Sequence, residues 1–220
     1  NTFWSGAFGS EGKNSGLDHI FGVHIPLTEV NKLGLPALES QNIEGLGVHR
    51  QQFSKNIVED AGYKELFDKA LPDLPEEERY TRKGASFAIS AFLRQLLTTQ
   101  APFQLWLKGD EDAMTDQQKK GAALFFGKAG CTGCHYEKNL GSMKFEALGV
   151  DDLYEHGGLN TGPNDARNLG RAFFTNRPED KFKFRTPQLY NMGDSGPYFH
   201  GGSIETIEGV IKYFNTGKKQ

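Results

Sequence analysis

The chain has 220 residues, 25 basic and 28 acidic side chains and a formal net charge of -3, so it carries no basic excess for a nucleic acid. We find no apolar run of about 18 residues, which excludes a membrane-spanning helix in this sequence. Glycine contributes 27 residues, about 12 per cent against an average near 7 per cent, and this favours long loops and tight turns.

The N-terminal half alternates loops with helical patterns. Residues 1–53 are expected to be loops with short helices, and residues 54–71 follow a helical spacing. The clearest helix is predicted over 81–99, with Thr81 as its N-cap and one apolar stripe. That stripe comprises Ala85, Ala88, Ile89, Phe92, Leu93, Leu96 and Leu97.

In the C-terminal half, Thr115 and Gln118 resemble a capping box that opens a helix to about Lys128. Residues 137–202 are expected to be mostly irregular, with brief helices near 150–155 and 186–192. A last helix is predicted over 204–215, and its buried face should hold Ile207, Val210, Ile211 and Phe214. Because no convincing alternating strand is visible, we predict a mostly α fold with long loops.

The two cysteines lie in the pentapeptide Cys131-Thr132-Gly133-Cys134-His135, the attachment pattern of c-type haem. Two thioether bonds would fix the porphyrin to one short turn, and the imidazole of His135 would then ligate the iron. A thioredoxin-like pair would need a βαβ context, and a zinc site would need further ligands. We therefore predict one covalent haem c in an exported, periplasmic protein.

Several ordered blocks around this motif resemble bacterial dihaem cytochrome c peroxidases and MauG-like proteins. They are Phe3-Trp4-Ser5-Gly6, the lead-in from Ala85 to His135, Phe184-Arg185-Thr186-Pro187-Gln188-Leu189-Tyr190-Asn191, Gly196-Pro197-Tyr198-Phe199-His200-Gly201-Gly202, and the closing helix. The resemblance implies cytochrome c-like haem domains. Residues 1–80 would be a remnant of the N-terminal peroxidatic domain with connecting helices, and 81–220 the C-terminal, electron-transferring domain.

The resemblance also implies a function. Such proteins reduce hydrogen peroxide to water with electrons from a small cytochrome c or cupredoxin, whereas MauG-like members oxidise a partner protein. We keep both readings open, together with a monohaem electron carrier. A homodimer is a further expectation. The sequence begins at Asn1 without Met or an apolar leader, and the first haem motif of the family is missing. We therefore expect a processed, truncated or proteolysed form, whose intact product holds a second haem.

The sequence leaves several alternatives for the distal ligand of the haem iron. The family's ligand position in the last helix matches Phe214, which cannot ligate iron. Tyr213 points about 100° away on the helix and would need an altered helix orientation. The alternatives are a five-coordinate iron or a Met from elsewhere, such as Met192.

Other family roles fall on residues outside the motif. Glu44 lies one residue off the family's catalytic Glu, and His49 is a second acid-base candidate. Trp4 matches the tryptophan between the two haems. The backbone carbonyls of Ser195 and Pro197 match two calcium ligands, and oxygen donors suit Ca²⁺.

Overall fold

A computed structural model describes residues 3–216, and it divides into two compact units. Within the described range, the first unit holds residues 3–96 and 172–178, and the second holds 97–171 and 179–216. The compact units divide at 96/97, because the helix that follows Thr81 packs against the helix over residues 37–48. The functional domain boundary expected at 80/81 stays a prediction.

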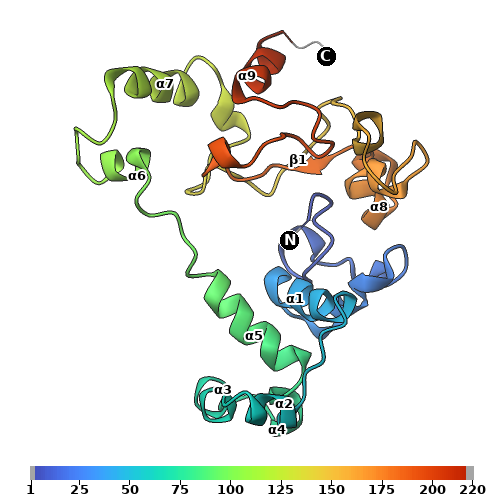
Figure 1. The fold of residues 1–220 in the computed structure, drawn as a ribbon. Helices are drawn as coiled ribbons and strands as arrows, with labels where there is room; N and C mark the ends of the chain where they lie inside the picture. Colours follow the sequence, from blue (N-terminus) through green and yellow to red (C-terminus); the bar gives the residue numbers. More distant parts are fainter. Residues whose placement is uncertain (1–2, 217–220) are drawn as a thin grey trace. The chain divides into compact units, whose positions relative to one another are not determined.

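The fold is mostly helical, as predicted (Figure 1). The first unit contains the 3-10 helices η1 (Gly12–Asn14), η2 (Asp18–Ile20) and η3 (Pro26–Leu33) and the α-helices α1 (Ala37–Val48), α2 (Lys55–Asp60), α3 (Lys64–Ala70), α4 (Glu76–Arg79) and α5 (Arg82–Leu93). With 12 residues, α1 is longer than the short helices expected before residue 53.

The second unit holds short elements joined by loops. They are α6 (Pro102–Leu107), α7 (Asp116–Phe126), η4 (Cys131–Gly133), β1 (Phe145–Glu146), η5 (Leu153–His156), η6 (Ala166–Leu169), β2 (Phe184–Arg185), η8 (Met192–Asp194) and α9 (Ile207–Thr216). Two further elements, α8 (Arg171–Thr175) and η7 (Pro178–Asp180), include residues of both units, because residues 172–178 belong to the first unit. β1 and β2 form a two-residue antiparallel ladder, which pairs Phe145 with Arg185.

Local signals placed several helix ends correctly. The hydroxyl of Thr81 accepts a hydrogen bond from the backbone of Lys83 and opens α5. Thr115 and Gln118 form the predicted capping box of α7. The helix expected over 54–71 is instead two helices, because Gly62 adopts a positive φ of 75° between them.

The buried face of α5 differs from the predicted apolar stripe. Its buried residues are Gly84, Ala85, Ser86 and Ser90, whereas Phe92 is 62 % exposed. Small side chains allow close packing on α1: Ser86 donates a 2.8 Å hydrogen bond to the Glu39 carbonyl, and Asn42 donates to the Ser90 hydroxyl at 2.9 Å. Of the predicted stripe, Ala85 is buried, Ile89 is exposed like Phe92, and Leu96 and Leu97 lie beyond the end of α5.

The last helix shows a second correction. The residue buried from α9 is Tyr213, whereas Ile207, Ile211 and Phe214 of the predicted buried face are exposed. The Tyr213 hydroxyl donates to the Leu148 carbonyl, which fixes this side of the helix toward the unit. The helix expected near 186–192 does not form over 186–191; a single 3-10 turn, η8, begins at Met192.

The core of the first unit combines apolar and amide side chains. Its apolar cluster joins Ala7, Leu17, Ile20, Phe21 and Phe174, and Phe21 stacks on Phe174 with 6.3 Å between ring centroids. The fully buried Asn14 and Asn31 donate to backbone carbonyls between Gly6 and Gly9. These amides satisfy buried backbone groups that no regular element pairs.

Candidate functional site

The two cysteines lie on one tight turn that follows α7. Gly130 precedes the turn with φ of 70°, a conformation that glycine adopts without strain. Cys131 and Cys134 are both free thiols and half-buried, and the His135 amide donates to the Cys131 carbonyl at 3.0 Å. The turn therefore holds the three motif residues together in the order that covalent attachment needs.

The orientation of the His135 imidazole is set by a backbone group. Its Nδ1 lies 2.7 Å from the carbonyl oxygen of Leu140. Because a carbonyl can only accept, this hydrogen bond needs the proton on Nδ1, and a neutral imidazole in that tautomer has its lone pair on Nε2. Such a partner on the second ring nitrogen is typical of metal-ligating histidines. Haem c needs two free thiols for its thioether bonds and an imidazole with a free lone pair for its iron. Cys131, Cys134 and His135 supply these groups and so fit haem c.

Lys144 supports the same turn, and sequence reasoning missed it. Its ammonium donates a 2.8 Å hydrogen bond to the carbonyl of Gly133, inside the motif, and lies 5.3 Å from the centroid of the Tyr136 ring. Its backbone carbonyl accepts from Thr186, beyond the end of β2. Lys144 lies 11 positions after Gly133 in the chain, so no local pattern could reveal the contact.

The two later sequence blocks meet in space. Phe184, on β2, stacks on His200 with 3.6 Å between ring centroids and an interplanar angle of 8°. The His200 Nε2 lies 2.7 Å from a carboxylate oxygen of Asp152, which opens η5. The contacts of His200 with Phe184 and Asp152 were not predicted, although Phe184 and His200 lie in sequence blocks that resemble the peroxidase family.

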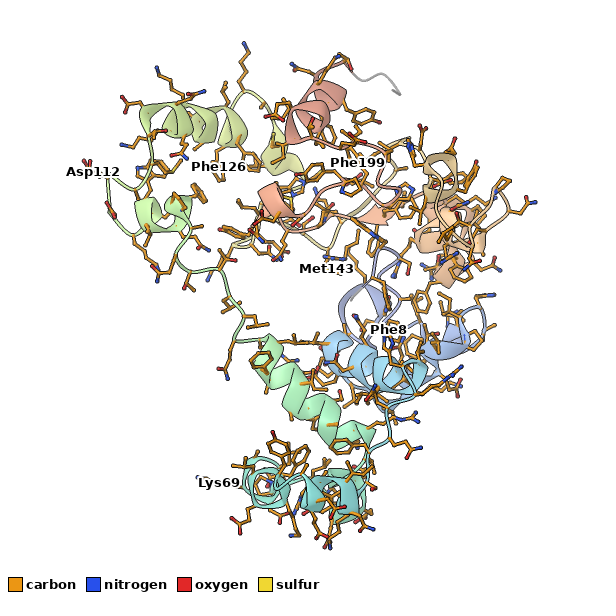
Figure 2. All side chains as sticks on the ribbon, viewed as in Figure 1. Phe8, Lys69, Asp112, Phe126, Met143 and Phe199 are labelled. Atoms are coloured by element: carbon orange, nitrogen blue, oxygen red, sulfur yellow. The ribbon has the colours of Figure 1, made fainter. Side chains whose placement is uncertain are left out.

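The candidate distal ligands differ in accessibility. Met192 is half-buried, and its backbone carbonyl accepts from the Tyr198 hydroxyl at 2.6 Å. Phe214 is 57 % exposed, whereas Tyr213 is buried and its hydroxyl is engaged by Leu148. Phe199 packs against both Tyr213 and Phe214, and Figure 2 marks its position. The identity of the ligand stays a prediction.

The predicted calcium carbonyls lie at a bend with a cis peptide bond between Gly196 and Pro197. Ser195 donates from its hydroxyl to the Asn191 carbonyl at 2.7 Å. Within residues 3–216, no group of three or more His, Cys, Asp or Glu side chains could hold a metal ion. A calcium site built on the backbone of Ser195 and Pro197 stays a prediction.

The first unit has a pocket of about 580 Å³ that is lined by residues of α1 and by Phe8. Figure 2 marks the position of Phe8. Both acid-base candidates, Glu44 and His49, line it. Burial raises the pKa of the Glu44 carboxyl, and the positive charge of Arg82 opposes that shift. The pocket therefore joins a carboxyl group that holds its proton more tightly than usual to an imidazole.

The remaining pocket walls are apolar or amide side chains. They are Phe3, Phe8, Leu27, Gln41, Asn42, Gly45, Leu46, Val48, Gln51 and Ile89. Trp4 follows Phe3 in the chain and is 40 % exposed, but it is not among the lining residues. Its predicted role as an electron bridge stays a prediction.

No helix within residues 3–216 is long and apolar enough to cross a membrane.

Comparison with known proteins identifies the family. Residues 3–112, half of the chain, match the family described as Di-haem cytochrome c peroxidase. Cytochrome c peroxidase Ccp of Escherichia coli is 38 % identical over 133 residues, which cover 60 % of this chain and 27 % of that protein. The methylamine utilization protein MauG of Methylorubrum extorquens is 35 % identical, covering 71 % of this chain and 40 % of MauG.

A solved structure agrees with this grouping. A MauG-like protein associated with microbial copper homeostasis matches with a TM-score of 0.59 and 28 % identity, over 84 % of this chain and 52 % of that one. The chain spans less than half the length of the curated relatives named here. The family match, the relatives and the C-x-x-C-H turn agree, and the chain thus belongs to the di-haem cytochrome c peroxidase and MauG family of peroxidase-like haem oxidoreductases.

Proposed function

We propose that this chain carries the electron-transferring haem of a periplasmic cytochrome c peroxidase, which reduces hydrogen peroxide to water. The observation that carries the proposal is the turn from Cys131 to His135, with its two free thiols and an imidazole fixed by Leu140. The peroxidase named in Escherichia coli, 38 % identical, supports the reaction type. The proposed domains are 1–80, from the peroxidatic half, and 81–220, the electron-transfer half.

The proposed roles of the turn residues follow from their chemistry. Cys131 and Cys134 hold the haem through thioether bonds, and His135 ligates the iron through Nε2. When bound, haem c accepts and releases one electron at a time. The Leu140 carbonyl keeps the imidazole proton on Nδ1, which makes Nε2 a stronger donor. Lys144 holds the Gly133 carbonyl and so limits movement of the turn.

In this proposal the pocket of the first unit belongs to the peroxide-reducing half, which holds the second haem in the intact protein. Reduction of one peroxide consumes two electrons and two protons and releases two waters. Glu44 is the proposed acid-base residue, because its raised pKa keeps a proton available nearer to neutral pH. His49 lines the same pocket and is the second candidate. Trp4 is the proposed electron bridge.

The proposed electron donor is a small cytochrome c or cupredoxin. We also propose a homodimer, and a calcium site formed by the backbone carbonyls of Ser195 and Pro197.

A second candidate function is MauG-like oxidation of a partner protein. It is favoured by Phe214, a side chain without a donor atom at the family's distal-ligand position, and by the 35 % identity to MauG. A monohaem electron carrier is the third candidate.

Mass spectrometry of the protein isolated from its source, combined with peroxide turnover, tests the proposal. We expect a chain larger than 24.4 kDa with two haems, of which one lies on the Cys131–His135 peptide. Cys131→Ser combined with Cys134→Ser should abolish covalent haem on that peptide, whereas Thr132→Ala, at a motif position that forms no bond to haem, should retain it. A mass of this chain with one haem and no turnover would instead support the electron carrier.

A further inference from the structure

The stretch of chain that contains the attachment turn carries a charge opposite to that of the chain as a whole. Residues 127–144 contain three lysines, Lys128, Lys138 and Lys144, and one carboxylate, Glu137. All four side chains are exposed. We call the three lysines the lysine rim.

The rim lies close to the turn for reasons of chain geometry. Lys128 precedes Cys131 by three residues, and Lys138 follows His135 by three. Because consecutive Cα atoms are 3.8 Å apart, the Cα atoms of Lys128 and Lys138 lie within about 11 Å of the Cα of the nearest motif residue. Lys144 is held directly, through its 2.8 Å hydrogen bond to Gly133.

The negative charge of the chain gathers elsewhere. Residues 55–79, which form α2, α3 and α4, carry eight carboxylates and four cations. The net charge of -3 therefore does not describe the surface that a redox partner would meet at the attachment turn. At that surface an acidic protein would be attracted and a basic one repelled.

We propose that the lysine rim is the docking surface for the electron donor and that the donor is a small acidic redox protein. This inference rests on the proposed function, because it requires haem at the Cys131–His135 turn. Oppositely charged patches steer encounter and raise association rates, and the effect falls as salt screens it. Lys144 also holds the turn, so the rim is best tested at Lys128 and Lys138.

The test is the second-order rate at which a reduced donor transfers an electron to this haem in the intact protein, by stopped flow without peroxide. The probes are a strongly acidic cupredoxin and a strongly basic cytochrome c. The variant is Lys128→Glu with Lys138→Glu. The matched control is Lys69→Glu with Lys181→Glu, which makes the same change in net charge at exposed lysines on α3 and after η7.

At about 10 mM ionic strength, where charges act over about 30 Å, wild-type protein should accept electrons from the acidic donor at least about tenfold faster than from the basic one. The rim variant should lose at least about tenfold with the acidic donor, and the control less than about twofold. The differences should disappear near 1 M salt, where the screening length is about 3 Å. Circular dichroism and haem content should match wild type in both variants.

Equal losses in the two variants, or a preference for the basic donor, would overturn the inference while leaving the peroxidase proposal intact. Failure of the proposed function looks different, because the Cys131–His135 peptide would then carry no haem or the intact protein would not turn over peroxide.

Discussion

The ammonium group of Lys144 donates a 2.8 Å hydrogen bond to the carbonyl oxygen of Gly133, between the two cysteines of the attachment motif. The same ammonium lies over the Tyr136 ring at 5.3 Å. A fixed positive charge at this turn favours the state that has gained an electron, because the added negative charge is attracted to it.

Lys144→Met should therefore lower the reduction potential of the haem held by the turn, since the apolar stem is kept and the charge removed. Lys144→Arg, which keeps the charge, should restore most of the difference. Lys181→Met, an exposed lysine in another loop, is the control and should leave the potential nearly unchanged. Spectroelectrochemical titration gives the potentials, and equal shifts at the two lysines would contradict a specific role for Lys144.

Glu44→Gln should reduce peroxide turnover by about a hundredfold or more, the usual effect of losing an acid-base group. It should not reduce the free energy of unfolding at neutral pH. Burial raises the folded-state pKa of Glu44, so the folded protein holds this proton more tightly than the unfolded chain. The stability that this proton contributes to the folded state is fully present below the ordinary pKa of 4.5. It is lost as pH rises through the folded-state pKa of Glu44.

Stability measured against pH separates the two effects. The variant should match or exceed wild-type stability at neutral pH, where ionised Glu44 is held in a partly desolvated pocket. If His49→Gln lost turnover and Glu44→Gln did not, His49 and not Glu44 would be the acid-base residue.

Asp68→Asn should destabilise the first unit at neutral pH. Hydrogen bonds from Lys64, Tyr80 and Arg79 hold the pKa of the Asp68 carboxyl well below its ordinary value of 3.8. A lowered pKa gives stability that is present above the ordinary value and lost as pH falls through the folded-state pKa. The urea midpoint of the variant should thus be lower than wild type at pH 7, and the two should converge under strongly acidic conditions.

Asp73→Asn is the matched control for this experiment. Asp73 is exposed and lies in the turn between α3 and α4. Its substitution should leave the urea midpoint nearly unchanged. A midpoint shift as large as that of Asp68→Asn would show that loss of negative charge, not loss of the bonds to Arg79 and its neighbours, causes the effect.

The distal side of the haem is tested by two substitutions. If Met192 is the ligand, Met192→Ala should convert a low-spin ferric haem to a high-spin one, whereas Met143→Ala should not. If the iron is five-coordinate, the wild type should already be high-spin, and Phe214→Met should raise the potential by supplying a thioether. Electron paramagnetic resonance with potentiometry distinguishes the outcomes, and an unchanged spectrum in every variant would exclude both ligand proposals.

Local signals in the sequence predicted local structure well. Thr81 and the pair Thr115 and Gln118 cap their helices as expected, because a cap involves residues within one turn. The apolar stripes of α5 and α9 misled the prediction of their buried faces. Ser86 and Ser90 hydrogen-bond to α1, and Tyr213 hydrogen-bonds to Leu148, so polar partners distant in sequence determined which face lies inward.

By itself the sequence determined the family resemblance, and it predicts Cys131, Cys134 and His135 as attachment residues, because covalent attachment requires fixed residue types at fixed spacing. Only the tertiary structure decided which nitrogen of His135 keeps its lone pair, since that depends on where the Leu140 carbonyl lies. It also decided the contact of Lys144 with Gly133 and the stacking of Phe184 on His200. These contacts join residues that are apart in the chain, and no short-range pattern of residue types encodes them.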